Sequence, residues 1–191
     1  RLFCNDDSMR ILAPHTDSFG GYGGIAAANR HFLRALCTVE VVEEVVGIPR
    51  LMQEAPAESL PEGLTLRTNG LGSKWRYLRA LLHELAVDRD FDLVWCGHIH
   101  LVPLALLAGR LTGAPVVLHV HGIDAWTPTE KPLVNRLVSR GDAFISVSET
   151  TKRRLVEWSG LESKHGHVIP NTIDFDELWP GPKTTALLNR Y

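Results

Sequence analysis

Short apolar runs alternate along this chain with longer segments in which apolar residues recur every three or four positions. Runs of the first kind are typical of buried strands, and segments of the second kind of amphipathic helices. The strands predicted in this way are residues 10–14, 39–46, 64–68, 92–96, 116–120, 143–147 and 167–170. The predicted helices are residues 24–36, 74–89, 101–111 and 149–159, with one more that opens at 127–130 and ends before Gly141. This alternation predicts one doubly wound, Rossmann-like α/β domain, a mostly parallel sheet with helices on both faces.

Local signals refine three of these helices. In residues 74–89 the apolar side chains at 75, 78, 82 and 85 recur at steps of three and four, which predicts one apolar face. Residues 127–130, Thr-Pro-Thr-Glu, have the pattern of a capping box with proline at the first helical position. Ser148 and Gly160 are expected to cap the two ends of the helix at 149–159.

Composition narrows the class of protein. The 191 residues are 45% apolar and 22% charged, which excludes general disorder. Three widely spaced cysteines exclude a disulfide-stapled scaffold and favour a reducing, cytoplasmic compartment. A net charge of -2 gives no overall field for nucleic acid. The longest apolar run, residues 101–109, is too short to span a membrane.

The ends of the chain suggest a piece of a longer protein. Residues 1–8 are interpreted as an N-terminal extension, because Met9 opens a more natural beginning. Residues 9–174 form the predicted domain, and residues 175–191 are interpreted as a linker toward a further C-terminal domain.

Glycines precede the first predicted helix. In such sheets ligands bind beyond the carboxyl ends of the strands, and a glycine-rich turn at a helix N-terminus suits a phosphate. The segment 19–26, Phe-Gly-Gly-Tyr-Gly-Gly-Ile-Ala, lacks the Lys-Ser/Thr of a Walker A loop. Gly21, Gly23 and Ala26 match the dinucleotide pattern Gly-x-Gly-x-x-Ala, so a nucleotide-dependent oxidoreductase is one alternative. Two features count against it: the loop from His15 to Gly20 is long, and no acid ends the second strand.

Histidines supply the other candidate chemistry. His98-Ile99-His100 and His119-Val120-His121 are His-x-His pairs, which on a strand can offer two ligands to one metal, so a metallohydrolase is a second alternative. His119 is otherwise expected to be a hydrogen-bonded interior residue. His121 ends its strand, and Gly122 leaves space beside the ring. Asp124 could orient that histidine or accept sugar hydroxyls, and Trp126 offers a flat face to a sugar ring.

Four segments in this order resemble the N-terminal half of a glycosyltransferase of family 4, a retaining enzyme of the GT-B fold. They are Gly-Gly-Ile-Ala at 23–26, Ala-Pro-Val-Val-Leu-His-Val-His-Gly-Ile-Asp at 114–124, Ala-Phe-Ile-Ser-Val-Ser at 143–148 and Val-Ile-Pro-Asn-Thr-Ile-Asp at 168–174. The family usually has glycine at the position of Thr172 and threonine or a similar residue at that of His119. His98 is a loose match to a histidine that follows the family's fourth strand.

The resemblance implies transfer of a sugar from a nucleotide-sugar donor to a sugar or lipid-linked acceptor, with retention of configuration, no metal and no separate cofactor. By the same resemblance His121 is the catalytic candidate. The implied substrate-binding residues are Gly23, Gly24, Gly122, Asp124, Trp126, His98 and Asn171. A second domain of the same polypeptide would hold most of the nucleotide, so the chain alone is expected to be inactive.

Other expectations concern partners and role. No nucleic acid partner is expected, and peripheral contact with the inner face of a membrane is compatible with a lipid-linked acceptor. A non-catalytic module that binds a sugar or a phosphate is the remaining alternative.

Overall fold

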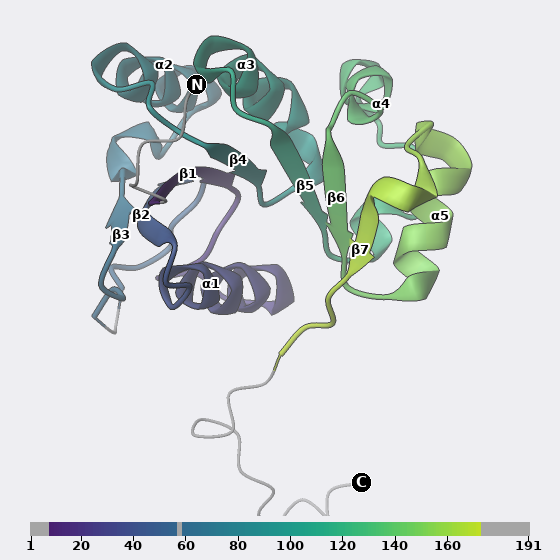
Figure 1. Ribbon diagram of the computed structural model, residues 1–191, viewed down its shortest axis with the longest axis horizontal. Helices are drawn as coiled ribbons and strands as arrows, with labels where there is room; N and C mark the ends of the chain where they lie inside the picture. Colours follow the sequence, from purple (N-terminus) through teal and green to yellow (C-terminus); the bar gives the residue numbers. More distant parts are fainter. Residues whose placement is uncertain (1–7, 57–58, 173–191) are drawn as a thin grey trace, which may run out of the picture.

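The computed structural model describes residues 8–56 and 59–172, and within them the chain forms one parallel sheet of seven strands (Figure 1). The order across the sheet is β3-β2-β1-β4-β5-β6-β7. The strands are β1 Met9–His15, β2 Val42–Pro49, β3 Leu64–Leu66, β4 Leu93–Cys96, β5 Val116–Val120, β6 Ala143–Ser146 and β7 Gly166–Val168. From β1 the chain moves outward to β3 and then returns to β4 on the other side. Ligands bind in sheets of this kind where the connections diverge, here beyond the carboxyl ends of β1 and β4.

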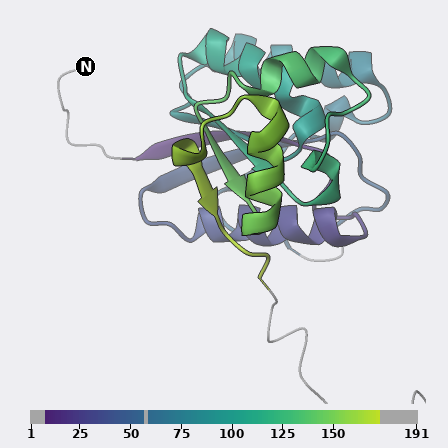
Figure 2. The same ribbon diagram turned by 90° about the vertical axis from the view of Figure 1, so that its right-hand side faces the viewer.

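Helices cover both faces of the sheet, as predicted. They are α1 Gly24–Cys37, α2 Lys74–Val87, α3 Val102–Thr112, α4 Pro132–Val138 and α5 Glu149–Ser159. Helix α1 lies on one face, α2, α3 and α4 lie on the other, and α5 packs against β6, β7 and α4 (Figures 1 and 2). One buried apolar cluster, which includes Leu33 and Trp95, lies under α1, and a larger one lies under the other helices. The doubly wound α/β prediction is therefore confirmed.

Several predicted elements have different bounds in the structure; the strand predicted at residues 64–68, for example, ends at Leu66. The second strand was predicted at residues 39–46, but β2 begins at Val42 and continues to Pro49. Val39 and Val41 are exposed in the turn before it. Proline is compatible with the strand because it takes the final position, opposite His15 of β1. The last strand was predicted at residues 167–170, and β7 instead ends at Val168.

The capping box predicted at residues 127–130 is wrong. Those residues form a loop, and α4 begins at Pro132 after the N-cap residue Lys131. The side-chain oxygen of Asn135 accepts the backbone N–H of Thr129 at 2.8 Å, and its amide donates to the Thr129 carbonyl at 2.7 Å. Thr129 is thus tied to a side chain of the helix rather than to its backbone ladder. By contrast, the predicted caps of α5 are confirmed: the Ser148 hydroxyl accepts the N–H of Thr151, and Gly160 is left-handed.

Helix α2 exists where predicted, but its apolar face was assigned wrongly. Of the four residues whose spacing predicted it, only Leu85 is buried. Trp75 is 77% exposed and Leu82 is 40% exposed. The helix packs instead through other side chains, namely Tyr77, Ala80, Leu81, Glu84 and Leu85.

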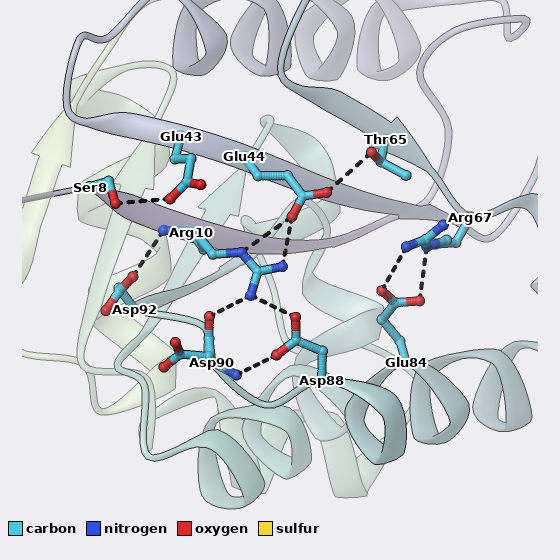
Figure 3. A network of polar contacts seen from close by, with 10 residues as sticks. All are labelled: Ser8, Arg10, Glu43, Glu44, Thr65, Arg67, Glu84, Asp88, Asp90 and Asp92. Carbon is cyan, nitrogen blue, oxygen red and sulfur yellow. Dashed lines mark hydrogen bonds and ion pairs between the residues drawn. The ribbon is translucent and has the colours of Figure 1, made fainter. Parts of the chain in front are cut away.

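A polar network joins the amino ends of the central strands (Figure 3). Arg10 of β1 donates to Glu44 of β2 at 2.7 Å and to Asp88, after α2, also at 2.7 Å. It also donates to the carbonyl of Asp90 at 3.0 Å. Beside it Arg67 and Glu84 form a second pair at 2.9 Å. Arg10 therefore connects two strands with the α2–β4 turn, at the edge of the sheet opposite the candidate site.

Candidate functional site

The loop of residues 16–23, between β1 and α1, leaves a helix N-terminus open. Gly23 is the N-cap residue, with φ 95° and ψ 172°, and no side chain in the described part of the chain caps α1. A Cβ atom added at Gly23 or at Gly24 would meet no other atom within 4 Å. Backbone N–H groups in the first turn of a helix have no partner within the helix, and they carry partial positive charge. The predicted glycine pair therefore lies at a bare helix end that suits an anion.

Beside this helix end lies a pocket of about 280 Å³, whose lining includes Gly21, Gly23, Arg30 and Glu54. The Nε atom of Arg30 is buried, and it has no hydrogen-bond partner among the described residues. Glu54 accepts a hydrogen bond from the Tyr22 hydroxyl at 2.6 Å. The pocket thus combines a guanidinium group with a helix N-terminus, a donor set typical of phosphate sites.

Arg30 was missed by the sequence reasoning. Its signal was available, because Gly23, Ala27 and Arg30 follow one another at steps of four and three and so share a helix face. A basic residue two turns after a glycine pair can reach the same anion as the helix end.

Buried polar groups hold the loop from beneath. His15 donates from Nδ1 to the carbonyl of Ala13 at 2.8 Å, and its Nε2 accepts from the Ser18 hydroxyl at 2.7 Å. Complete burial lowers the pKa of His15 to about 4, so the ring is neutral near pH 7. The Asn29 amide donates to the carbonyl of Asp17 at 2.8 Å, which fixes the loop to α1.

His121 lies just past the end of β5, and one hydrogen bond orients it. Its Nε2 lies 3.1 Å from the carbonyl oxygen of Gly97. Because a carbonyl only accepts, Nε2 carries the proton and Nδ1 keeps a lone pair. That Nδ1 is buried and has no partner among the described residues. Burial also lowers the pKa of His121, so the ring is a neutral acceptor at pH 7.

Gly122 gives the backbone freedom beside this ring. Its φ is 142°, in the region that favours glycine, and an added Cβ would meet nothing within 4 Å. The predicted open space next to His121 is present.

The structure brings His98 and Asp124 close to His121. His98 Nδ1 accepts the backbone N–H of His100 at 3.1 Å, at the start of the short helix Ile99–Leu101. Burial lowers the pKa of His98 to about 4, partly offset by the negative charge of Asp124 and reinforced by neighbouring His121. One carboxylate oxygen of Asp124 is buried without a partner in the described part of the chain. A neutral imidazole with a free lone pair and a carboxylate can accept hydrogen bonds from hydroxyl groups.

Trp126 and Asn171 lie in other surroundings. The Trp126 indole donates to the Thr151 hydroxyl at 3.1 Å, and the Arg154 guanidinium lies 4.2 Å from the ring centroid. One face of the indole is thus covered, which leaves only the other for a sugar ring. Asn171 is exposed and lines a second cavity, of about 300 Å³, with His31, Phe32 and His119 beside α1.

His119 is interior, as predicted, but it lacks the predicted hydrogen bonds. Its ring packs 4.9 Å from that of Phe32, 5.8 Å from that of Trp95 and 4.4 Å from that of His121, measured between centroids. Neither ring nitrogen has a partner among the described residues, and burial lowers the pKa of His119 to about 3.

Neither alternative chemistry gains support from the described residues. Among residues 8–56 and 59–172, no three or more His, Cys, Asp or Glu side chains are grouped so as to hold a metal ion. His100 of the first His-x-His pair instead contacts Lys131, 2.8 Å from the ring to Nζ. Strand β2 ends at Pro49 and is followed by Arg50, so no acid stands where a dinucleotide site needs one.

The fold of this chain is similar to that of several solved structures. Anabaena HepE in complex with UDP and glucose superposes with a TM-score of 0.61 at 16% identity, over 88% of this chain and 46% of HepE. The lipopolysaccharide outer core galactosyltransferase WaaB, in its apo form, gives 0.61 at 12% identity, over 87% of this chain and 47% of WaaB. At such identities the likeness concerns the fold, a Rossmann-like half of a GT-B glycosyltransferase, and the chain spans about half the length of these neighbours.

The sequence comparisons reach the family level. No curated protein matches the chain. The family model for glycosyltransferase family 4 matches residues 22–177, which is most of the chain and includes the glycine pair, His98, His121 and Asp124. The chain therefore belongs to glycosyltransferase family 4.

Proposed function

We propose that this chain is the acceptor-side domain of an enzyme that transfers a sugar from a nucleotide-sugar donor to an acceptor, with retention of configuration and without a metal. The observation that carries the proposal is the family match over residues 22–177. The neighbour HepE was solved with UDP and glucose and with UDP-glucose, which favours a uridine nucleotide sugar as the donor class. WaaB, named for lipopolysaccharide, favours a lipid-linked glycan as the acceptor.

The residues support distinct roles in this function. The open N-terminus of α1 and the Arg30 guanidinium would bind a phosphate group of the donor or the acceptor. His121, neutral and held by the Gly97 carbonyl, would accept a hydrogen bond from a hydroxyl of the transferred sugar. Asp124 and His98 would complete this acceptor-rich edge. Such fixed groups act by preorganisation, because they need not reorient as charge develops in the transition state.

The test uses the polypeptide encoded by the whole reading frame alongside the 191-residue chain. We expect the longer polypeptide to release UDP from a uridine nucleotide sugar when an acceptor is present, and the 191-residue chain to release none. A second domain would supply most of the nucleotide contacts; in support, this chain matches only 46% of HepE. Measurable turnover by the 191-residue chain would show that transfer does not need a second domain.

His121→Ala in the longer polypeptide tests the catalytic assignment. Removal of one preorganised polar group from a transition state costs on the order of 10²–10³ in kcat. The matched control is His165→Ala, because His165 is exposed and lies away from the carboxyl edge of the sheet. Normal kcat in His121→Ala, with folding confirmed by circular dichroism, would remove His121 from the site.

A further inference from the structure

Two histidines at the carboxyl end of β5 pack against each other through their rings. His119 belongs to the strand and His121 follows two positions later, a spacing that brings side chains to the same face of a sheet. Their ring centroids are 4.4 Å apart, and the ring planes are inclined by 37°. At this separation the rings are in direct contact, so the position of one limits the orientations open to the other.

The hydrogen bonding of His121 leaves its ring incompletely fixed. The bond from Nε2 to the Gly97 carbonyl fixes one atom, but the ring can still turn about that atom, because the last side-chain torsion of histidine has a broad energy minimum. Nδ1 has no partner among the described residues, so no second hydrogen bond opposes the rotation. The contact with the ring of His119 supplies a second constraint.

The ring of His119 is held in turn by two further aromatic side chains. Its centroid lies 4.9 Å from that of Phe32 in α1 and 5.8 Å from that of Trp95 in β4. Those two rings stack on each other at 5.1 Å, with an interplanar angle of 17°. Trp95 is 1% exposed and His119 is 3% exposed. Side chains from α1, β4 and β5 thus enclose His119 and give its ring one position.

The nitrogen atoms of His119 take no part in this support. Both are buried, and neither has a hydrogen-bond partner in the described part of the chain, which costs free energy of folding. Burial lowers the pKa of His119 to about 3, so the ring places no charge beside His121 near pH 7. What His119 offers its neighbour is therefore a flat, uncharged surface.

We propose that His119 is a positioning residue for His121, and that its ring fixes the orientation in which His121 presents the lone pair of Nδ1. The catalytic consequence rests on the proposed function, in which His121 contacts the transferred sugar. Misplacement of a group at a reaction centre by about 1 Å can lower the rate on the order of 10²-fold. Loss of the His119 ring should therefore reduce kcat more than it changes KM.

Two substitutions separate the ring of His119 from its nitrogen atoms. His119→Phe keeps a flat ring without nitrogens, whereas His119→Val removes the ring and leaves space beside His121. In the 191-residue chain labelled with ¹⁵N-histidine, long-range ¹H–¹⁵N spectra at pH 8 show which nitrogen of each neutral ring carries the proton. The resonances of His121 are identified by their loss in His121→Ala. We expect His121 to be protonated at Nε2 alone in the wild type and in His119→Phe, and to show both tautomers in His119→Val.

A matched control separates this effect from a general loss of packing. Phe144 is completely buried and pairs with Leu118 in the sheet, so it faces the side opposite His119. Phe144→Leu should lower the free energy of unfolding and leave the tautomer of His121 unchanged. If His119→Val does not fold, Phe32→Leu takes its place, because it removes one of the two rings that hold His119 and should also produce the second tautomer.

Kinetics of the longer polypeptide test the catalytic consequence. We expect kcat for UDP release to fall at least about tenfold in His119→Val and to stay within about threefold of the wild type in His119→Phe, with KM for the nucleotide sugar changed less than about threefold in both. The proposal is overturned if His121 keeps a single tautomer in both His119→Val and Phe32→Leu, or if His119→Phe disturbs it as strongly as His119→Val. It is also overturned if His119→Val keeps normal kcat while His121→Ala loses it. Normal kcat in His121→Ala would instead contradict the proposed function, and the spectra would still decide whether His119 fixes the ring of His121.

Discussion

The two glycines that open α1 differ in what constrains them. Gly23 has a φ of 95° and an extended ψ, a conformation open in practice only to glycine. Gly24 has no such constraint, and the space where its side chain would lie is empty of protein atoms. Gly23 is therefore required by the backbone, whereas a side chain at Gly24 would occupy only the space where we propose that a phosphate binds.

These constraints predict that one alanine substitution affects stability and the other affects substrate binding. Gly23→Ala should lower the free energy of unfolding by about 1–3 kcal/mol, the cost of the strained backbone. Gly24→Ala should leave that free energy within about 1 kcal/mol of the wild type and, in the longer polypeptide, raise KM for the phosphate-bearing substrate at least tenfold. Urea unfolding and steady-state kinetics measure the two effects. An unchanged KM in Gly24→Ala would place the phosphate elsewhere.

The sequence predicted the positions of several residues where a local rule applied. The glycine pair, His121 and Gly122 lie at the carboxyl edge of the sheet as expected, because residues that follow parallel strands gather at that edge. Arg30 was missed although its spacing from the glycine pair places it on the same helix face, because the sequence does not show that the preceding loop forms a pocket there. The absent hydrogen bonds of His119 could not be predicted, since they depend on which aromatic rings surround it.

At the scale of elements, periodicity located the helices better than it oriented them. In α2 the four spaced apolar residues predicted the helix, but the burial of Tyr77 and Leu81 shows that packing chose another side. Before α4 the residues of the predicted capping box form a loop, in which Thr129 is hydrogen-bonded to the Asn135 side chain of that helix. The spacing of apolar residues indicates where a helix forms, whereas packing against the sheet determines which of its faces is buried.

The Arg10 network predicts a measurable contribution to stability. Arg10 is mostly buried, contacts Glu44, Asp88 and the Asp90 carbonyl, and lies 5.1 Å from the centroid of the Phe91 ring. Arg10→Met would leave two partly buried carboxylates without their partner, so the free energy of unfolding should fall by about 2 kcal/mol.

The control for this prediction is a pair of the same kind on the surface. Arg153 and Glu157 of α5 lie 3.9 Å apart and are mostly exposed, so Arg153→Met should change stability by less than about 0.5 kcal/mol. Urea unfolding of both variants decides the matter. Equal losses would show that the Arg10 network contributes no more than a surface ion pair.

For the whole molecule, buried histidines make stability depend on pH. The pKa of His15 is lowered to about 4 and that of His119 to about 3, in both by burial, against about 6.5 in an unfolded chain. Well above pH 6.5 both states are neutral at these rings, and pH has no effect through them. Between pH 6.5 and about 4 the unfolded chain binds protons that the folded chain does not, so stability is lost as pH falls.

Urea unfolding between pH 8 and pH 5 should therefore show a plateau above pH 7 and a fall below 6.5, of up to about 1.4 kcal/mol per pH unit for each buried histidine. Buried Asp17, whose pKa is raised by burial, acts in the opposite direction and reduces the slope toward the acid end.

His119→Phe should raise the free energy of unfolding at pH 7, because it removes two unpartnered buried nitrogens from an aromatic cluster. It should also reduce the dependence of that free energy on pH below 6.5, because the unfolded variant binds one proton fewer. His165→Phe, at an exposed position, should leave the slope unchanged. A flat profile from pH 7 to pH 5, or equal slopes in the two variants, would mean that His119 takes up its proton in the folded state, which its enclosure by Phe32, Trp95 and His121 opposes.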